Sequence, residues 1–287
     1  MGMLRERMAE DLKLRGLAPI TVASYLRYAQ RFAEHYAPRS PLRLGEREVR
    51  KFLLHMVEEK GVSPSTHVVC LAGIKFLYEV TLRRPEVVKR IPYPKRPVSI
   101  PDVLSGSEVQ RLLGCITSIR MRLICTTMYA TGLRVAEACH LRPGDIDAQR
   151  RLIHVRLGKG GRDRQVPMGE KLVGLLREYW RIARPEGEYL FPGDAPGRPI
   201  SAKSVWLALQ TATRAARIRK RVHPHTLRHC YATHQLERGV NLRTLQAVLG
   251  HASLETTLRY LRVLPEHVAG LKSPLDVLGT PEGELLR

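Results

Sequence analysis

Near its carboxyl end, the chain carries basic side chains at spacings suited to chemistry on a phosphate group. His225 and Arg228 stand three residues apart just after Pro224, so a helix that begins near this proline places both side chains on one face. A phosphodiester under attack gathers negative charge on its non-bridging oxygens, and a planar guanidinium binds two such oxygens at once. Arg228 is therefore a candidate phosphate-binding residue, with His225 beside it.

A histidine and a tyrosine follow on the next elements of the same stretch. An apolar period after residue 241 ends at Gly250, a typical helix stop, and delivers His251 to the turn that follows. Ser253 is suited to cap a short helix, and we expect that helix to carry Tyr260, nine residues after His251. A tyrosine with its ordinary pKa of about 10 is a poor nucleophile at neutral pH. Tyr260 therefore needs neighbouring groups that activate it.

The charge of the whole chain indicates a polyanionic partner. Its 287 residues include 48 lysine and arginine residues against 27 aspartate and glutamate residues, which gives a formal net charge of +21. An excess of this size favours an extended polyanion as the partner, and nucleic acid is the first candidate. The sequence contains no apolar stretch long enough to span a membrane and no secretory signal pattern, so we expect a cytoplasmic, nucleoid-associated protein that does not bind membranes.

Cysteine and histidine spacing argues against a metal site. The five cysteines are odd in number and form no C-x-x-C pair, which indicates buried, reduced thiols rather than disulfides or a cysteine zinc site. His225 and His229 stand four residues apart, but Thr226 occupies the place where a zinc hydrolase of the H-E-x-x-H type has glutamate. We therefore expect no metal and no cofactor.

The first part of the chain is predicted to be all helical. Apolar residues recur with a 3.6-residue period over 19–36 and again over 46–60, and a further helix opens at Ser63 and Pro64. With a helix around residues 3–15, these elements make a predicted unit over residues 1–91.

The rest of the chain is predicted to be a basic, proline-rich linker over 92–101 and a mixed second unit over 102–287. In that unit the segment RLIHVRLGKGGRDRQVPM predicts two short strands around a glycine-rich turn with Lys159 at its tip. Arg134 follows a Thr-Gly turn and precedes Glu137 by three residues. Apolar residues after Tyr260 form a tail that we expect to dock on a neighbouring surface.

Taken together, these motifs resemble the tyrosine recombinase family, the phage integrase and Xer group, and integron integrases, over the full length of the chain. Each motif alone is weak, but their order and spacing are specific. They are ATGLRVAE with Arg134 and Glu137, GKGGRDRQVP with Lys159, HTLRH with His225, Arg228 and His229, LGH with His251, and TTLRY with Tyr260.

The resemblance implies a mainly α fold with a small antiparallel β-hairpin or sheet. A helical, SAM-like core-binding domain and an α+β catalytic domain would close on double-stranded DNA as a C-shaped clamp. Four protomers, identical or related, would act together on two DNA sites. The implied activity is that of a site-specific DNA recombinase or integrase, as found in mobile elements.

The resemblance also implies a role for each site residue. Tyr260 would attack a DNA phosphodiester to form a 3′-phosphotyrosyl bond, while Arg134 and Arg228 clamp the non-bridging oxygens and His251 donates to one of them. The covalent bond stores the energy of the phosphodiester, so strands can be rejoined without ATP or metal.

Four further residues would support this chemistry. By the same resemblance, Lys159 would protonate the departing 5′-oxygen and His225 would assist proton transfer at the tyrosine. Glu137 would orient the arginines. We interpret His229 as structural or as a residue that supports the site from a second layer, and a direct catalytic role stays open.

Two other functions remain compatible with parts of the pattern. A non-catalytic DNA-binding accessory protein of the same fold needs phosphate contacts but no tyrosine nucleophile. A type IB topoisomerase-like enzyme shares the covalent chemistry but reseals the same strand. The complete set of motifs favours the recombinase over the first, and the separate helical domain and apolar tail favour it over the second.

Overall fold

The computed structural model describes residues 2–94, 102–156, 163–251, 253–258 and 260–261. The chain divides into two compact units, Met1–Ser99 and Ile100–Arg287. Most of the predicted linker over 92–101 lies outside the described residues, as do Lys159 and the apolar tail after Leu261. The predicted domain limits of 1–91 and 102–287 therefore stay predictions.

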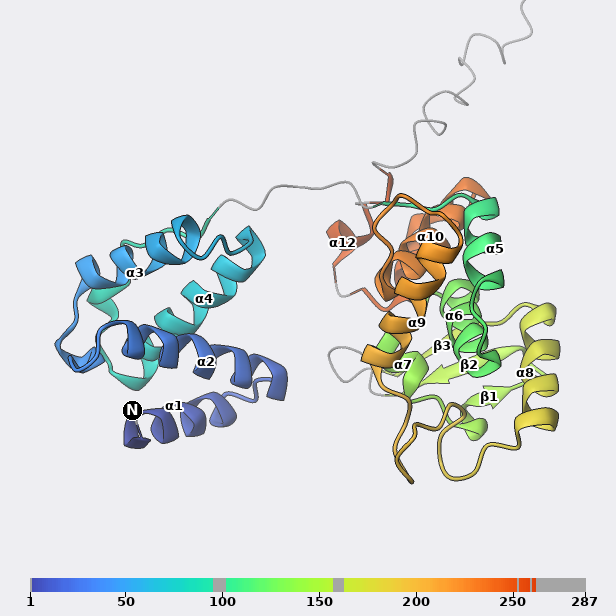
Figure 1. Ribbon diagram of the computed structural model, residues 1–287, viewed down its shortest axis with the longest axis horizontal. Coiled ribbons are helices and arrows are strands. Elements are labelled where there is room, and N and C mark those ends of the chain that lie inside the picture. Colours follow the sequence, from blue (N-terminus) through green and yellow to red (C-terminus); the bar gives the residue numbers. More distant parts are fainter. Residues whose placement is uncertain (1, 95–101, 157–162, 252, 259, 262–287) are drawn as a thin grey trace, which may run out of the picture. The chain divides into compact units, whose positions relative to one another are not determined.

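The first unit is built of helices. Its described residues form the α-helices α1 (Gly2–Leu14), α2 (Pro19–His35), α3 (Glu46–Glu58) and α4 (Pro64–Phe76) (Figure 1). The predicted start of the last helix is confirmed, because the Ser63 hydroxyl accepts the backbone N–H of Thr66 at 3.3 Å and Pro64 occupies the first helical position. A π-helical turn over Leu77–Thr81 then extends α4, and local periodicity gave no sign of it.

Aromatic side chains fill the centre of this unit. Phe32 packs edge-on against Phe52 and Tyr78, with ring centroids 5.2 and 6.1 Å apart. Where α2 and α4 cross, Gly73 allows close approach, since a Cβ atom there would lie 3.1 Å from the Tyr25 Cα. These contacts give the helical unit a core of its own.

The second unit combines helices with a small antiparallel sheet. Three strands pair in the order β1 (Ile146–Asp147), β2 (Leu152–Val155) and β3 (Arg164–Pro167). The predicted hairpin is confirmed as β2 and β3, with Val155 paired to Arg164. Strand β1 was missed, because a strand of two residues is too short to show alternating polarity.

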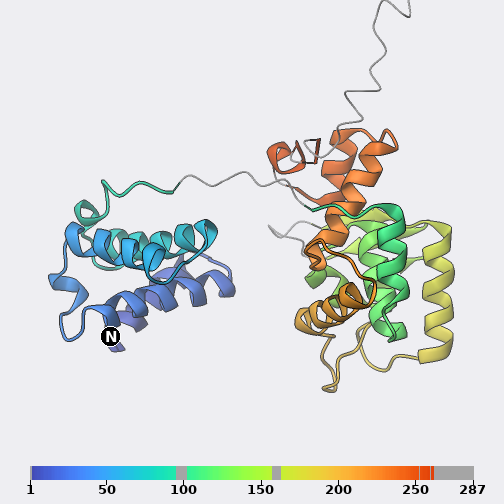
Figure 2. The ribbon, with the colours of Figure 1, turned by 45° about the horizontal axis from the view of Figure 1, so that its top comes forward.

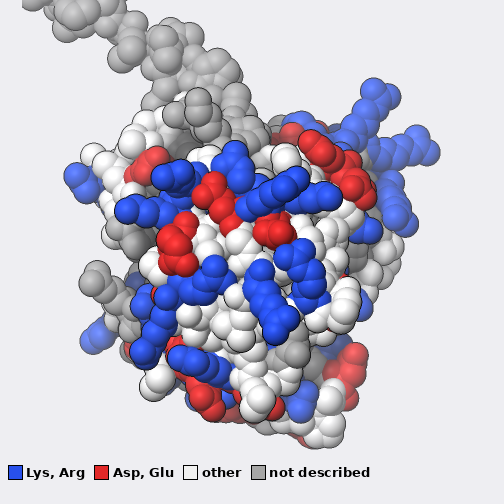
Figure 3. All heavy atoms as spheres, turned by 90° about the vertical axis from the view of Figure 1, so that its left-hand side faces the viewer, with Lys and Arg blue, Asp and Glu red and all other residues white. Residues whose placement is uncertain are grey.

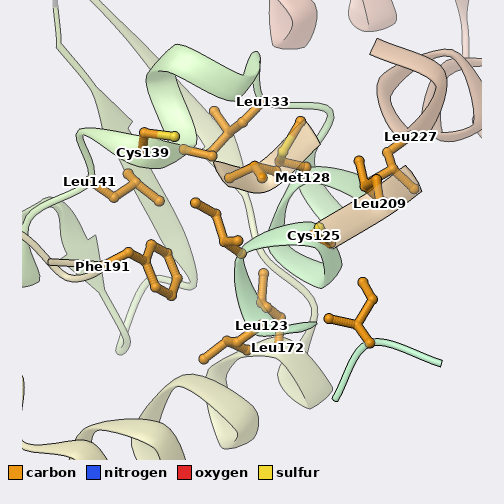
Figure 4. Close-up of a cluster of buried hydrophobic side chains, with 14 of the residues drawn as sticks. Leu123, Cys125, Met128, Leu133, Cys139, Leu141, Leu172, Phe191, Leu209 and Leu227 are labelled. Carbon is orange, nitrogen blue, oxygen red and sulfur yellow. The ribbon is translucent and has the colours of Figure 1, made fainter. Parts of the chain in front are cut away.

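Helix α6 (Ile119–Thr131) forms the centre of the second core. It packs against α5 (Gly106–Gly114), α8 (Glu170–Ala183), α9 (Ala202–Ala215) and α10 (Pro224–Glu237) (Figure 2). Figure 4 shows Leu123, Cys125 and Met128 of this helix among buried side chains that include Leu209 and Leu227. The core holds α10 firmly in place, and α10 carries Arg228.

The segment that follows α10 positions the last predicted site residues. Helix α11 (Leu242–Leu249) ends at Gly250, whose φ of 62° is left-handed, so the predicted helix stop is confirmed. Helix α12 (Leu254–Leu258) is shorter than we expected, and Tyr260 lies in a turn just after it rather than on it. The backbone N–H of Tyr260 still bonds the Thr257 carbonyl at 3.0 Å.

Three general features accompany this fold. The five cysteines are free thiols, and all but the half-buried Cys115 are buried. Among the described helices, none combines the length and apolarity that crossing a bilayer requires. Figure 3 looks onto the first unit and shows lysine and arginine side chains spread across that face, with acidic side chains between them.

Candidate active site

Arg228 is a buried arginine held between two backbone carbonyls. Its side chain is only 3% exposed, and its two terminal nitrogens donate to the carbonyls of Gly132 and Leu249, each at 2.6 Å. Burial, together with the nearby Arg134, lowers the pKa of Arg228 to about 10, which leaves it charged at neutral pH. A buried cation beside another cation destabilises the fold unless an anion binds between them. A phosphate group would supply that anion.

Arg134 reaches the same place from another element. It lies at the N-cap of α7 (Val135–Cys139), where the Glu137 carboxylate accepts its backbone N–H at 2.8 Å and its Nη1 at 2.7 Å. Its Nη2 donates to the Gly250 carbonyl at 3.2 Å, one residue beyond the carbonyl that Arg228 binds. The structure therefore brings the two arginines together at the end of α11.

The turn before Arg134 depends on Gly132. This residue has a φ of 68°, and a Cβ atom on it would lie 2.5 Å from Cδ1 of Tyr231 and 2.8 Å from Cδ2 of Leu249. The left-handed backbone and the close contact each favour glycine. The Thr-Gly turn thus allows α6 to end against α10 and α11.

Glu137 is the carboxylate that joins the basic residues. Burial alone would raise its pKa, but hydrogen bonds from Arg164 and from the backbone and side chain of Arg134 outweigh burial and lower the pKa to about 2. Its carboxylate stays ionised at any pH near neutral. The predicted contact of Glu137 with an arginine is present in the structure.

Arg164 is a participant that sequence reasoning missed. It is the first residue of β3, and its Nη1 and Nη2 donate to the two carboxylate oxygens of Glu137 at 2.9 and 2.8 Å. Its Nε donates to the Val248 carbonyl at 2.9 Å. The sequence did carry a signal, since Arg164 is the final arginine of GKGGRDR in the hairpin motif.

Tyr260 lies inside this cluster. Its side chain is 3% exposed, and its hydroxyl shares a hydrogen bond with Nδ1 of His229 at 3.2 Å. Its ring stacks beside that of His251, with centroids 6.2 Å apart and planes inclined by 18°. Arg228 is close enough that the phenol influences its pKa. The tyrosine, both histidines and the arginine thus belong to one site.

Two histidines are positioned by neighbouring side chains. His251 follows Gly250, and its Nδ1 shares a hydrogen bond with the Thr257 hydroxyl at 2.8 Å, which orients the ring. Thr257 was a second residue missed from sequence. His225 lies on α10 with its ring centroid 6.4 Å from that of His229, and burial followed by Arg228 lowers its pKa.

The remaining expectations concern Lys159 and metal ions. Lys159 falls within residues 157–162, outside the described part of the chain, although the strands before and after it are paired. The rings of His223, His225 and His229 lie 6.4–6.5 Å apart. Within the described residues, no group of three histidine, cysteine or acidic side chains is placed to hold a metal ion.

Comparison with known proteins identifies matches over both units. A model of the Phage integrase family matches residues 102–267, and one of the phage integrase N-terminal SAM-like domain matches residues 4–86. A putative integrase/recombinase of Sinorhizobium fredii is 42% identical over 282 residues, which cover 98% of this chain and 91% of that protein. The tyrosine recombinase XerA of Thermococcus kodakarensis is 36% identical over 283 residues, or 97% of each chain.

Solved structures give the same result at the level of the fold. A crystal structure of XerA recombinase matches with a TM-score of 0.54 and 28% identity, over 94% of this chain and 99% of that one. A lambda integrase dimer bound to a COC′ core site matches with a TM-score of 0.73 and 18% identity, over 91% and 94% of the two chains. The second match bears on the fold alone.

Proposed function

Because the chain belongs to the phage integrase family and is a tyrosine-type site-specific recombinase, we propose that it cleaves and rejoins DNA strands through a covalent bond to Tyr260. One observation carries the proposal. Arg134 and Arg228 donate to adjacent carbonyls, those of Gly250 and Leu249, while Tyr260 lies against His229 and His251 in the same cluster.

The two arginines are the proposed phosphate clamp. Their contacts with backbone carbonyls fix both guanidiniums before DNA arrives, so little reorganisation is required when the phosphate gains negative charge. The like charges of Arg134 and Arg228 also favour an anion between them, since Arg134 lowers the pKa of Arg228. His251, held by Thr257, would donate a further hydrogen bond to a non-bridging oxygen.

Proton transfer at the tyrosine falls to the neighbouring histidines. As the Tyr260 oxygen attacks phosphorus, the hydroxyl proton must move to a base. Nδ1 of His229 already forms a hydrogen bond with this hydroxyl. His225, next on α10, would assist in its neutral form, which burial favours. Lys159 would protonate the 5′-oxygen that leaves. The product is a 3′-phosphotyrosyl bond and a free 5′-hydroxyl.

The covalent intermediate removes the need for ATP or a metal ion. A 5′-hydroxyl from a second duplex attacks the phosphotyrosyl bond, reforms the DNA phosphodiester and releases the phenol. The helical unit and the second unit would each contact the duplex. Four protomers on two sites would complete exchange, and we place the protein in the cytoplasm at the nucleoid.

One assay tests this function. The protein is incubated in EDTA with a random-sequence library of nicked duplexes, and the products are separated on a denaturing gel. We expect a covalent protein–DNA adduct that Tyr260→Phe abolishes, and recombinant joints when two duplexes carry the recovered sequence. Tight binding without an adduct would indicate the accessory role, and relaxation of supercoiled DNA without joints would indicate the topoisomerase-like role.

A further inference from the structure

Three arginines from three separate elements bind successive carbonyls at the carboxyl end of α11. Nε of Arg164 donates to the Val248 carbonyl at 2.9 Å, and Nη2 of Arg228 donates to the Leu249 carbonyl at 2.6 Å. Nη2 of Arg134 donates to the Gly250 carbonyl at 3.2 Å. The last carbonyls of a helix lack partners within the helix and carry the negative end of its dipole. Cations are therefore stabilised there, and the end of α11 holds all three guanidiniums in place.

Glu137 joins two of these arginines, Arg134 and Arg164, through hydrogen bonds. Its Oε1 accepts Nη1 of Arg134 at 2.7 Å and Nη1 of Arg164 at 2.9 Å, and its Oε2 accepts Nη2 of Arg164 at 2.8 Å. With Arg134 alone, the carboxylate would cancel the positive charge of that arginine and leave only Arg228 to attract a phosphate. With Arg164 added, the two guanidiniums and one carboxylate keep a net positive charge.

The surroundings of Arg164 are built to hold this geometry. The side chain is 10% exposed, and its position requires a glycine opposite it. A Cβ atom on Gly250 would lie 2.9 Å from Cδ of Arg164, and the φ of Gly250 is 62°. Arg164 also pairs with Val155 where the β2–β3 hairpin continues toward the segment that contains Lys159. It therefore ties the hairpin to the end of α11.

We propose that Arg164 is a positioning residue for strand cleavage. It orients the Glu137 carboxylate and, through that carboxylate, Arg134, and it preserves the positive charge of the site. This inference rests on the proposed function. The planar fork of the guanidinium is essential, because one group binds both carboxylate oxygens and a backbone carbonyl at the same time. A lysine supplies the charge without that geometry.

The test is a double-mutant cycle of Arg164→Gln and Glu137→Gln, with the nicked duplex recovered from wild-type adducts as the probe. We expect Arg164→Gln to slow single-turnover adduct formation by about 10- to 100-fold, the range typical of residues that orient a site. Affinity for the same duplex, measured in the Tyr260→Phe background, should change by less than about threefold. In the Glu137→Gln background, Arg164→Gln should slow adduct formation by less than about a further twofold.

Two further variants separate positioning from general damage. Arg164→Lys should recover part of the lost rate. Arg120→Gln is the matched control, because Arg120 also donates to a carbonyl, that of Pro192, and to a carboxylate, that of Asp194, outside the site. It should leave the rate of adduct formation unchanged. Fully additive effects of the two substitutions, or equal losses in Arg164→Gln and Arg120→Gln, would overturn the proposal.

Acid unfolding measured without DNA tests, independently of activity, whether Arg164 acts through Glu137. Loss of Arg164 removes a partner from a buried carboxylate, so the pH midpoint of acid unfolding should rise in Arg164→Gln but stay in place when Glu137→Gln is already present. A rise of equal size in both backgrounds would contradict the proposal. Absence of any wild-type adduct would contradict the recombinase function instead, while this cycle would still decide whether Arg164 acts through Glu137.

Discussion

The Tyr260 hydroxyl lies 3.2 Å from Nδ1 of His229. We expected His229 to be structural or to support the site from a second layer, and the family resemblance implied that His225 assists proton transfer. The contact puts His229 at the phenol itself, while the His225 ring lies 6.4 Å from that of His229. Because an isolated tyrosine keeps its proton at neutral pH, the histidine that shares this hydrogen bond is the first candidate for the base.

Substitution of His229 should therefore impair cleavage more than substitution of His225. We expect His229→Gln to slow adduct formation by about 10²- to 10³-fold, within the range for loss of a general base, and His225→Gln to have the smaller effect. Single-turnover rates on the recovered duplex, measured from pH 6 to pH 9 as an assay range, would compare them. Equal losses in the two variants would argue against a special role of His229.

Glu137 should make the second unit sensitive to acid. Its folded pKa of about 2 lies below the ordinary value of 4.5, so its ionised form stabilises the fold fully above pH 4.5. That contribution, on the order of 3 kcal/mol, is lost as the pH falls toward the folded pKa.

Denaturant unfolding at several pH values checks this sign. Both tryptophans, Trp180 and Trp206, lie on helices of the second unit, so their fluorescence follows that unit selectively. Glu137→Gln should be less stable at neutral pH and should lose less stability than the wild type on acidification below pH 4.5. If the stability of Glu137→Gln falls in parallel with that of the wild type, ionisation of Glu137 is not the cause of the acid sensitivity.

Gly132 should tolerate no side chain. In Gly132→Ala the new Cβ would meet Tyr231 and Leu249 at 2.5 and 2.8 Å, and the backbone φ is 68°. Strain and overpacking together should destabilise the second unit by about 2–5 kcal/mol. Gly144→Ala is the control, since a Cβ there meets nothing within 4 Å. Similar urea midpoints for the two variants would contradict this reading of the turn.

The first unit should contribute phosphate contacts through α1 and α2. Arg5, Arg27 and Arg31 line one shallow hollow, and the guanidiniums of Arg27 and Arg31 lie 5.0 and 5.9 Å from the ring centroid of Tyr28. We expect Arg27→Ala and Arg31→Ala each to weaken duplex binding regardless of sequence and to reduce the salt slope by about 1. Arg50, paired with Glu46, offers the control Arg50→Ala. An unchanged salt slope in Arg27→Ala and Arg31→Ala would show that this hollow does not contact DNA.

Local signals in the sequence predicted much of this architecture. The helix start at Ser63 is present, with the serine hydroxyl accepting the Thr66 N–H at 3.3 Å, and the helix stop at Gly250 is where it was expected. Caps, stops and apolar periods act within a few residues, so they can be recognised without knowledge of the fold.

Contacts between distant segments could not be predicted in this way. Arg164 reaches Glu137 and Val248, which are 27 and 84 residues away along the chain. Its role depends on how β3 packs against α11, not on any local period. The position of Tyr260 just beyond α12 was also missed, because five helical residues give no full apolar pattern. The prediction for Lys159 lies outside the described residues.

The central claim is that Tyr260 is joined to DNA while Arg134 and Arg228 hold the same phosphate. Mass spectrometry of protease-digested adducts tests it most directly, with wild type, Arg134→Lys and Arg228→Lys compared on one duplex. We expect the nucleotide on the peptide that contains Tyr260, and far less of that peptide in either lysine variant despite retained DNA binding. A nucleotide attached to any other residue, or undiminished adduct in both variants, would contradict the claim.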